Sequence, residues 1–300
     1  MSGLPRQTAV SRRALLVTGL AGLGCLGAAG LGVGLVETEV LPGKLRLDRA
    51  LGRCGDAPPV PAETAVLQAQ TFRSAARGKD VNLLVMTAQA AVKGLPVVIL
   101  LHGLGGNARA GLGLRLDRHL AHVVARGTPP FALVAVDGDD TYWHPRASGD
   151  DPQKMITDEV LPRLRKQGFR TDRIGLLGWS MGGYGALLLA QTLGSSRVAA
   201  VAASSPAVFS SYANAKATNA QAFDDAADFA RHDVSAGLNR LDGVSTWIDC
   251  GHSDPFADVT GRLRSRLHQP AGGLFEGCHD GSYWGRRAQG QLTFLGRHLA

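Results

Sequence analysis

The sequence predicts an α/β fold in which a mostly parallel central sheet carries helices on both faces. Three observations lead to this prediction. Short apolar runs recur along the chain and are typical of strands buried in a parallel sheet. Segments with apolar residues at helical spacing separate these runs. No stretch between them is long enough to form a large cap domain.

Composition and charge indicate a globular protein that does not bind nucleic acid. The chain has 300 residues, of which 45% are hydrophobic, and this is ample for one large core. Its formal net charge is +7. The basic residues are scattered rather than clustered with aromatic residues, so we expect no nucleic-acid partner.

Residues 1–36 are predicted to be an export signal or a membrane anchor. Arg12 and Arg13 precede an uncharged run from Ala14 to Val36, and no acidic residue occurs before Glu37. A positive region before an apolar one is typical of a signal, and paired arginines indicate the twin-arginine route. We therefore expect a protein that is secreted, held in the cell envelope or anchored in the membrane.

The fate of this signal is left open by the sequence. No A-x-A cleavage site precedes Glu37, and the run over 14–36 is long enough to span a bilayer, which would allow membrane association. Gly22-Leu23-Gly24-Cys25 also resembles part of a lipoprotein cleavage site.

A linker or surface-wrapping segment is predicted over 37–66, because prolines and mixed charges recur there without periodicity. The catalytic domain is expected over 67–300. It begins with two antiparallel strands, 71–74 and 81–86, joined through 77–80.

Strands and helices then alternate. The expected strands are 96–101, 131–136, 174–177, 198–203, 246–250 and 274–278. The expected helices are 114–125, 155–164, 259–267 and 289–299. Residues 209–245 are polar and rich in Ala and Asp, so we expect short helices over the strand ends.

A nucleophile is predicted where the strand 174–177 turns into an apolar helical segment. The turn reads Gly178-Trp179-Ser180-Met181-Gly182, and G-x-S-x-G between a strand and a helix is typical of a nucleophile elbow. Such a serine has a strained backbone, and glycines two positions away provide the room that it needs. We therefore predict that Ser180 attacks the substrate.

A serine hydroxyl needs a base to accept its proton and a carboxylate to orient that base. In the α/β-hydrolase arrangement the acid and then the histidine follow the serine, each on a loop after a strand. His279 directly follows a predicted strand, whereas His268 and His298 fall in helical regions. His279 is therefore the predicted base.

Asp254 is the predicted acid, because it lies on the turn after the strand 246–250. Asp249 lies inside that strand and is the weaker candidate. The backbone N–H groups of Met181 and Leu104 are the predicted oxyanion donors, one at the start of a helix and one on the glycine-rich loop after the strand 96–101. His102, on the same loop, is expected to be structural.

Several aromatic residues are candidate walls of the substrate pocket, with packing in the core as the alternative. They are Trp143, Trp179, Tyr184 and Trp284, with Tyr212 and Tyr283 as further candidates.

Cysteines and histidines allow a competing interpretation. Cys250, His252, Cys278 and His279 could form a zinc site, but their spacing is not typical of one and Ser180 would then lack a base. A disulfide among Cys54, Cys250 and Cys278 agrees with export, and its connectivity stays open.

Together these motifs resemble the putative esterase family, which groups esterase D, feruloyl esterases and the mycobacterial antigen 85 mycolyltransferases. The resemblance rests on motifs around Leu101–Gly106, Gly178–Leu187, Cys250–Phe256 and His279–Trp284. It implies an α/β-hydrolase fold and the same triad and oxyanion donors. The apolar export segment and Val40–Leu47 resemble the corresponding segments of exported actinobacterial members of the family.

The resemblance also has departures. Antigen 85 proteins usually carry Ala at the position of Gly182 and use Glu as the acid. Esterase D acts on S-formylglutathione in the cytosol, which an export signal does not favour.

We therefore predict an exported serine carboxylesterase that acts on a small-molecule or lipid ester and needs no metal or organic cofactor. An antigen 85-like acyltransferase, transferring mycolyl or diacylglycerol acyl groups, is the first alternative, because water and alcohol acceptors use the same triad. A non-catalytic surface binding protein on the same scaffold is the second.

Overall fold

The computed structural model describes residues 44–90 and 93–300. The predicted export signal, 1–36, lies outside these residues. The chain divides into two compact units, Met1–Gly52 and Arg53–Ala300. In the first unit the described residues form the short helix α2 (Lys44–Ala50). None of the helices in the described part of the chain is long and apolar enough to cross a membrane.

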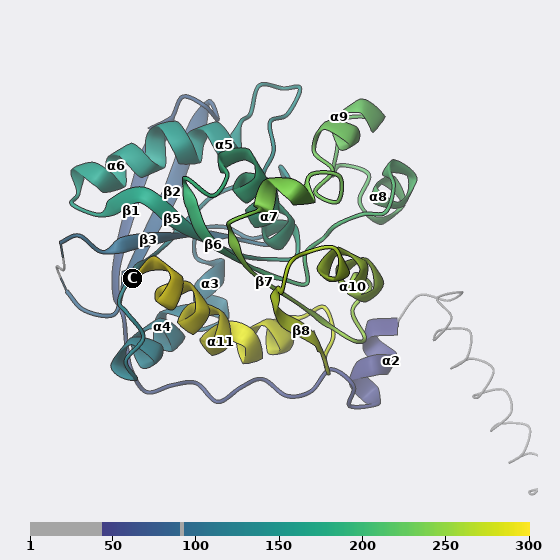
Figure 1. Ribbon diagram of the computed structural model, residues 1–300, viewed down its shortest axis with the longest axis horizontal. Helices are drawn as coiled ribbons and strands as arrows, with labels where there is room; N and C mark the ends of the chain where they lie inside the picture. The colour runs from purple at the N-terminus through teal and green to yellow at the C-terminus, as the bar shows by residue number, and fades with distance from the viewer. Residues whose placement is uncertain (1–43, 91–92) are drawn as a thin grey trace, which may run out of the picture. The chain divides into compact units, whose positions relative to one another are not determined.

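An eight-stranded sheet forms the centre of the second unit (Figure 1). In spatial order its strands are β1 (Val66–Ser74), β2 (Lys79–Thr87), β4 (Ala132–Val136), β3 (Pro96–Leu101), β5 (Arg170–Trp179), β6 (Val198–Ser204), β7 (Ser245–Gly251) and β8 (Ala271–Phe275). Strand β2 pairs antiparallel with both β1 and β4, and the strands from β4 to β8 are parallel. This is the predicted mostly parallel sheet.

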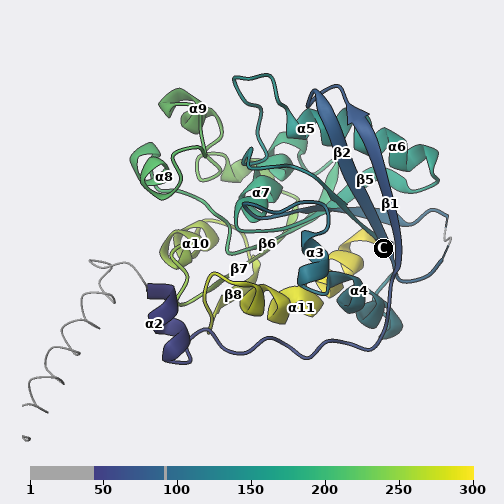
Figure 2. The same ribbon diagram turned by 180° about the vertical axis from the view of Figure 1, so that it is seen from behind.

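Helices cover both faces of the sheet, because successive strand residues point to opposite sides. In β3, Val97, Ile99 and Leu101 pack in one apolar cluster with α6 (Leu161–Lys166) and α7 (Met181–Leu193). Val98 and Leu100 pack in the other cluster with α4 (Leu116–Ala125) and α11 (Gly281–Leu299). Figure 1 and the reverse view in Figure 2 show α4 and α11 together on one side of the sheet.

Short helical segments complete the second unit. They are α3 (Ala110–Gly113), α5 (Pro152–Lys154), η1 (Met155–Val160), α8 (Tyr212–Thr218), α9 (Ala226–Arg231), η2 (Leu238–Leu241) and α10 (Ala257–Ser265). The short helices expected in the polar region 209–245 are α8, α9 and η2, which together cover less than half of it. No large cap is present among the described residues.

Residues 53–65 follow the surface of α4 and α11 rather than forming a helix or strand. Arg118 of α4 donates to the carbonyl of Ala62 (3.2 Å), and His122 lies 3.1 Å from the carboxylate of Glu63. Arg286 of α11 donates to the carbonyls of Cys54 and Asp56. These contacts hold the segment before β1 against the domain.

Several element boundaries differ from prediction: β1 begins five residues before the predicted 71, and β5 begins four residues before the predicted 174. The strand predicted at 274–278 is β8 (Ala271–Phe275), and it ends three residues earlier. The backbone of Gly277 has a φ of 149°, so the chain leaves the extended conformation before Cys278. The last helix, α11, begins at Gly281 instead of 289 because the side chain of Asp280 accepts from the N–H of Tyr283 and caps its start.

Candidate active site

Ser180 lies on a sharp turn between β5 and α7. Its φ and ψ are 55° and −124°, a conformation that L-residues other than glycine rarely adopt. A Cβ on Gly178 would overlap the carbonyl of Gly182, and a Cβ on Gly182 would overlap the carbonyl of Leu101. The two glycines of G-x-S-x-G are therefore required by close backbone approach.

A chain of hydrogen bonds joins the three predicted triad residues. The hydroxyl Oγ of Ser180 lies 2.8 Å from Nε2 of His279, and Nδ1 of His279 lies 2.8 Å from Oδ2 of Asp254. The second oxygen of Asp254 accepts from the backbone N–H of Phe256 (2.8 Å). Both carboxylate oxygens are therefore engaged, which fixes the orientation of the acid.

The loops that carry the acid and the base are joined by their backbones. The N–H of Ser253 donates to the carbonyl of Gly277 (2.9 Å), and the N–H of His252 donates to the carbonyl of Phe275 (2.8 Å). A Cβ on Gly251 would overlap the carbonyl of Gly277, so this glycine permits the approach. The spacing between Asp254 and His279 is thus set by main-chain hydrogen bonds.

A disulfide joins Cys54 to Cys278, the residue directly before His279. Cys250 remains a free thiol in the interior, and burial raises its pKa. The zinc interpretation is therefore wrong, because the sulfur of Cys278 is covalently bonded and His279 is engaged with Asp254 and Ser180. The disulfide ties the loop of the base to the segment before β1.

The predicted oxyanion donors lie on the two elements that meet at the turn. Met181 is the first residue of α7, so its N–H is one of those that a helix leaves without an intrahelical partner. Leu104 lies on the loop after β3, and the pairing of Leu101 with Gly178 brings that loop beside Ser180. The side chain of Leu104 is largely exposed (52%).

His102 is buried beneath this loop and is structural, as predicted. Its Nε2 accepts from the N–H of Gly138 (2.9 Å), so Nδ1 carries the proton and donates to the carbonyl of Gly103 (2.8 Å). Burial lowers the pKa of His102, which keeps the ring neutral. The ring therefore supports the loop that carries Leu104.

Two aromatic rings flank the imidazole of His279. Trp284 meets it edge-on with ring centroids 5.1 Å apart. The ring of Phe256 is tilted relative to the imidazole, with ring centroids 5.3 Å apart. Trp179 packs 6.1 Å from Trp284. Trp284 and Trp179, both predicted pocket residues, are thus at the site. Phe256 was missed, although it lies only two residues after Asp254.

Trp143 and Tyr184, two of the candidate pocket residues, instead pack in the core. The indole of Trp143 is fully buried and donates to the carbonyl of His102 (3.1 Å). The hydroxyl of Tyr184 donates to the carbonyl of His232 (2.7 Å) from inside the domain. Of the further candidates, Tyr283 is also fully buried, and Tyr212 packs on Phe229.

Asp249 is a core residue, in agreement with its place inside β7. Its carboxylate accepts from Ser204 (2.6 Å), from the indole of Trp247 (2.5 Å) and from Gln291 (2.7 Å). Burial raises the pKa of this carboxyl against the effect of those donors. Its side chain therefore ties β6 and β7 to α11.

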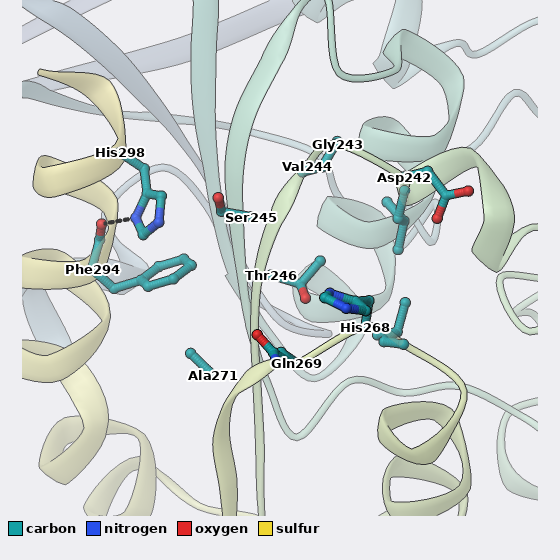
Figure 3. Close-up of a pocket in the computed structure, with 12 residues that line it drawn as sticks. Asp242, Gly243, Val244, Ser245, Thr246, His268, Gln269, Ala271, Phe294 and His298 are labelled. Carbon is teal, nitrogen blue, oxygen red and sulfur yellow. Dashed lines mark hydrogen bonds between the residues drawn. The ribbon is translucent and has the colours of Figure 1, made fainter.

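Two cavities of the domain lie away from the serine. One of about 570 Å³ is lined by Ser245 and Thr246 at the start of β7, together with His268, Phe294 and His298 (Figure 3). Asp254 follows the other end of β7, so this cavity is at the opposite edge of the sheet from the triad. A neighbouring cavity of about 610 Å³ is lined by residues of α4 and α11. Neither contains a predicted site residue.

The sheet order, the helices on both faces and the serine on the strand-to-helix turn define an α/β-hydrolase fold. The family model described as "Putative esterase" matches residues 74–287, which is more than half of the chain. The chain therefore belongs to the putative esterase family. A search of curated proteins found no match.

Solved structures with the same fold include several esterases. A ferulic acid esterase matches with a TM-score of 0.67 and 20% identity over 79% of this chain and 99% of its own. S-formylglutathione hydrolase from Staphylococcus aureus matches with a TM-score of 0.62 and 20% identity, over 77% of this chain and 99% of its own. MPT51 from Mycobacterium tuberculosis matches with a TM-score of 0.63 and 14% identity, over 79% of this chain and 100% of its own.

Proposed function

We propose that the protein is a serine carboxylesterase that works through an acyl-enzyme on Ser180. The observation that carries this proposal is the Ser180–His279–Asp254 hydrogen-bond chain, with both distances at 2.8 Å and the serine at a φ of 55°. Membership of the esterase family supports ester hydrolysis as the reaction class.

Each residue has a distinct part in the proposed reaction. His279 accepts the hydroxyl proton as Oγ of Ser180 attacks the ester carbonyl, and it then protonates the leaving alcohol. Asp254 holds the imidazole in the tautomer with its proton on Nδ1 and stabilises the imidazolium. The N–H groups of Met181 and Leu104 stabilise the tetrahedral oxyanion. A water molecule, deprotonated by His279, then releases the acid.

The test is hydrolysis of a series of p-nitrophenyl esters of increasing acyl length. We expect Ser180→Ala to lower kcat by at least about 10³-fold at every length, because it removes the nucleophile and leaves only the oxyanion site. Ser210→Ala, which changes an exposed serine outside the triad, should keep full activity. Equal slow hydrolysis by the wild type and Ser180→Ala would contradict the proposal.

The same assay addresses the acceptor. Adding trehalose or diacylglycerol reports transfer of the acyl group to an alcohol instead of water. We propose water as the acceptor, and product analysis should show free acid alone at all acceptor concentrations. Substantial transfer product would instead assign the acyltransferase activity to the same Ser180.

We further propose that the protein is exported, with 1–36 as its signal or anchor. The Cys54–Cys278 disulfide supports an oxidising compartment, because such bonds are rare in reducing cytosol. Labelling fractionated cells with a fluorophosphonate probe should give a Ser180-dependent signal outside the cytoplasm. A signal confined to the cytoplasm, with Cys54 and Cys278 reduced, would rule export out.

A further inference from the structure

His144, Asp228 and His232 form a compact cluster apart from the triad. One potential ligand atom from each, a ring nitrogen or a carboxylate oxygen, lies within 4.8 Å of the other two. His144 follows Trp143 on the loop after β4, whereas Asp228 and His232 lie on α9 and at its end. His144 and Asp228 are buried and His232 is half-buried. The cluster therefore connects two separate segments of the domain.

The ring of His144 is surrounded by oxygen atoms. Its Nε2 lies 3.0 Å from the carbonyl of Ala222, and its Nδ1 lies 3.0 Å from the carbonyl of Pro145 and 3.8 Å from Oδ2 of Asp228. A neutral imidazole has a single N–H, so one nitrogen directs a lone pair at oxygen. A bound cation would resolve this repulsion.

The position of Nε2 also matches a pattern common in metal sites. A metal-ligating histidine usually donates its other ring N–H to a carbonyl or a carboxylate, which fixes the tautomer and the ring. Donation from Nε2 to Ala222 leaves Nδ1 of His144 as the ligand atom, on the side of Asp228.

Asp228 and His232 are spaced by four residues and share one face of the helix. Nδ1 of His232 lies 3.0 Å from Oδ1 of Asp228 and 3.0 Å from the main-chain carbonyl of the same residue. The rings of His144 and His232 stack with centroids 4.5 Å apart. An ion bound tetrahedrally at about 2.1 Å separates its ligand atoms by roughly 3.4 Å. The 3.8 Å between Nδ1 of His144 and Oδ2 of Asp228 is close to that value.

Asp228 has two other partners. Its Oδ2 accepts from the N–H of Asp224 (2.9 Å), an interaction that a metal-bound carboxylate can keep. Arg231 pairs with Oδ1 at 3.3 Å, but its side chain is 63% exposed and can turn into solvent. The carboxylate is thus held in place for an ion, and the competing guanidinium is displaceable.

We propose that His144, Asp228 and His232 bind a divalent transition-metal ion, with Zn²⁺ the best match and water as the remaining ligand. Two imidazoles and one carboxylate are a common ligand set for Zn²⁺. The ion is structural and joins α9 to the loop after β4. The cluster includes no triad residue, so the proposal does not depend on the esterase function.

The ion would stabilise the aromatic packing between these segments. Phe223 stacks on His144 with ring centroids 5.2 Å apart, and Tyr184 donates to the carbonyl of His232. An ion that joins α9 to the loop after β4 therefore also holds Phe223 against His144 and His232 against Tyr184. In the sequence, this cluster corresponds to an aspartate and a histidine four residues apart and a distant histidine, a pattern too common to predict a site by itself.

The experiment uses the full chain after chelation and dialysis, titrated with ZnCl₂ alone by calorimetry. We expect one site with a dissociation constant on the order of micromolar or tighter, and a higher Tm in the presence of Zn²⁺. His232→Ala should weaken binding at least tenfold and remove the Tm increase. His298→Ala, which changes an exposed histidine elsewhere, should bind like the wild type.

A second variant guards against simple misfolding. His232→Gln keeps a hydrogen-bonding side chain at the end of α9 and should fold with the wild-type circular dichroism spectrum while losing Zn²⁺ binding. Co²⁺ in place of Zn²⁺ should give the visible absorption of a tetrahedral site in the wild type only. Failure of the wild type to bind Zn²⁺, or equal binding by the folded His232→Gln, would overturn the proposal.

Discussion

At the scale of single residues, the backbone of Ser180 is the feature on which the site depends. A positive φ at a residue other than glycine costs free energy on the order of 1–3 kcal/mol, and surrounding contacts must hold it. Here the N–H of Ser180 donates to Ser204 (2.9 Å), and its carbonyl accepts from Ala207 (3.0 Å) and Tyr184 (3.0 Å). These bonds keep Oγ directed at His279.

Gly182→Ala tests the close approach behind this turn. The added Cβ would overlap the carbonyl of Leu101, so α7 must move away from β3 and carry Ser180 with it. We expect a loss of kcat/KM of at least about 10²-fold, since small displacements of catalytic groups cost that much. The assay is the p-nitrophenyl series together with thermal unfolding.

Gly113→Ala is the matched control, because a Cβ there would meet no atom within 4 Å. It should leave both activity and Tm near wild-type values. If Gly182→Ala behaved like this control, the glycine would not be needed for space, and the elbow geometry would need another explanation.

Much of the residue-level site could be predicted from the sequence, because Ser180 directly follows a strand and Asp254 and His279 lie on the loops after two later strands. Trp143 could not be placed, since an indole after a strand has the same local pattern whether it faces substrate or core. Its burial depends on Gly138 and Gly185, where a Cβ would overlap the side chain of Trp143. Gly185 lies on a different element, α7, so the sequence around Trp143 does not show this contact. Such tertiary contacts leave no local signal.

At the scale of elements, the loops after β7 and β8 work as one unit. Main-chain hydrogen bonds join them, and the Cys54–Cys278 disulfide fixes the second loop to the segment before β1. Arg286 strengthens this junction by donating to the carbonyl of Cys54 (2.7 Å) and to that of Glu276 (3.2 Å). The loop that carries His279 is thus held in place by the disulfide and by the hydrogen bonds of Arg286.

Cys54→Ser should lower the free energy of unfolding by about 2–5 kcal/mol, because the disulfide closes a chain segment with a sequence separation of 224. Urea unfolding with and without reductant measures this change. Reductant should destabilise the wild type to the level of Cys54→Ser and leave the variant unaffected. Equal stability of the oxidised wild type and Cys54→Ser would show that the disulfide contributes nothing.

The pairing of these cysteines could not be derived from the sequence. Cys250 and Cys278 both follow or end neighbouring strands, so either was a reasonable partner for Cys54. The structure separates them because β8 ends at Phe275 and Cys278 lies in the loop, whereas Cys250 lies inside β7. The predicted strand ended at 278, three residues beyond the observed end of β8, so the sequence did not distinguish Cys278 in a loop from Cys250 in a strand.

At the scale of the whole domain, Arg77 links the turn between β1 and β2 to the loop after β4. Its side chain is fully buried and pairs with Asp150 through Nε (2.7 Å) and Nη2 (2.9 Å). Burial tends to raise the pKa of Asp150, but the hydrogen bonds from Arg77 and Lys79 outweigh it, so the pKa is lowered. Folding therefore favours the charged carboxylate.

Asp150→Asn should lower the free energy of unfolding at pH 7 by about 3 kcal/mol, because it leaves a buried guanidinium short of a charge partner. A carboxyl whose pKa is lowered by folding stabilises the protein above its unfolded pKa of about 3.9, and this is lost as the pH falls through the folded value. The difference between wild type and variant should therefore shrink below about pH 4. Urea unfolding at pH 7, 5 and 3 measures it.

Asp172→Asn is the control for this prediction. Asp172 pairs with Arg165 at 3.0 Å, but both side chains are mostly exposed (80% and 62%), so solvent screens the interaction. This variant should unfold like the wild type at each pH. A pH-independent effect of Asp150→Asn would show that packing rather than charge accounts for it.

The order of the triad along the chain has a consequence for biosynthesis. Ser180 and His279 are separated by 99 positions, and the disulfide partner of Cys54 directly precedes His279. A ribosome that has completed the nucleophile turn has not yet made the base that activates it. Under the mechanism proposed above, products of interrupted translation therefore carry a serine without its base, and hydrolysis begins only after β7, β8 and the loop that carries His279 have been synthesised.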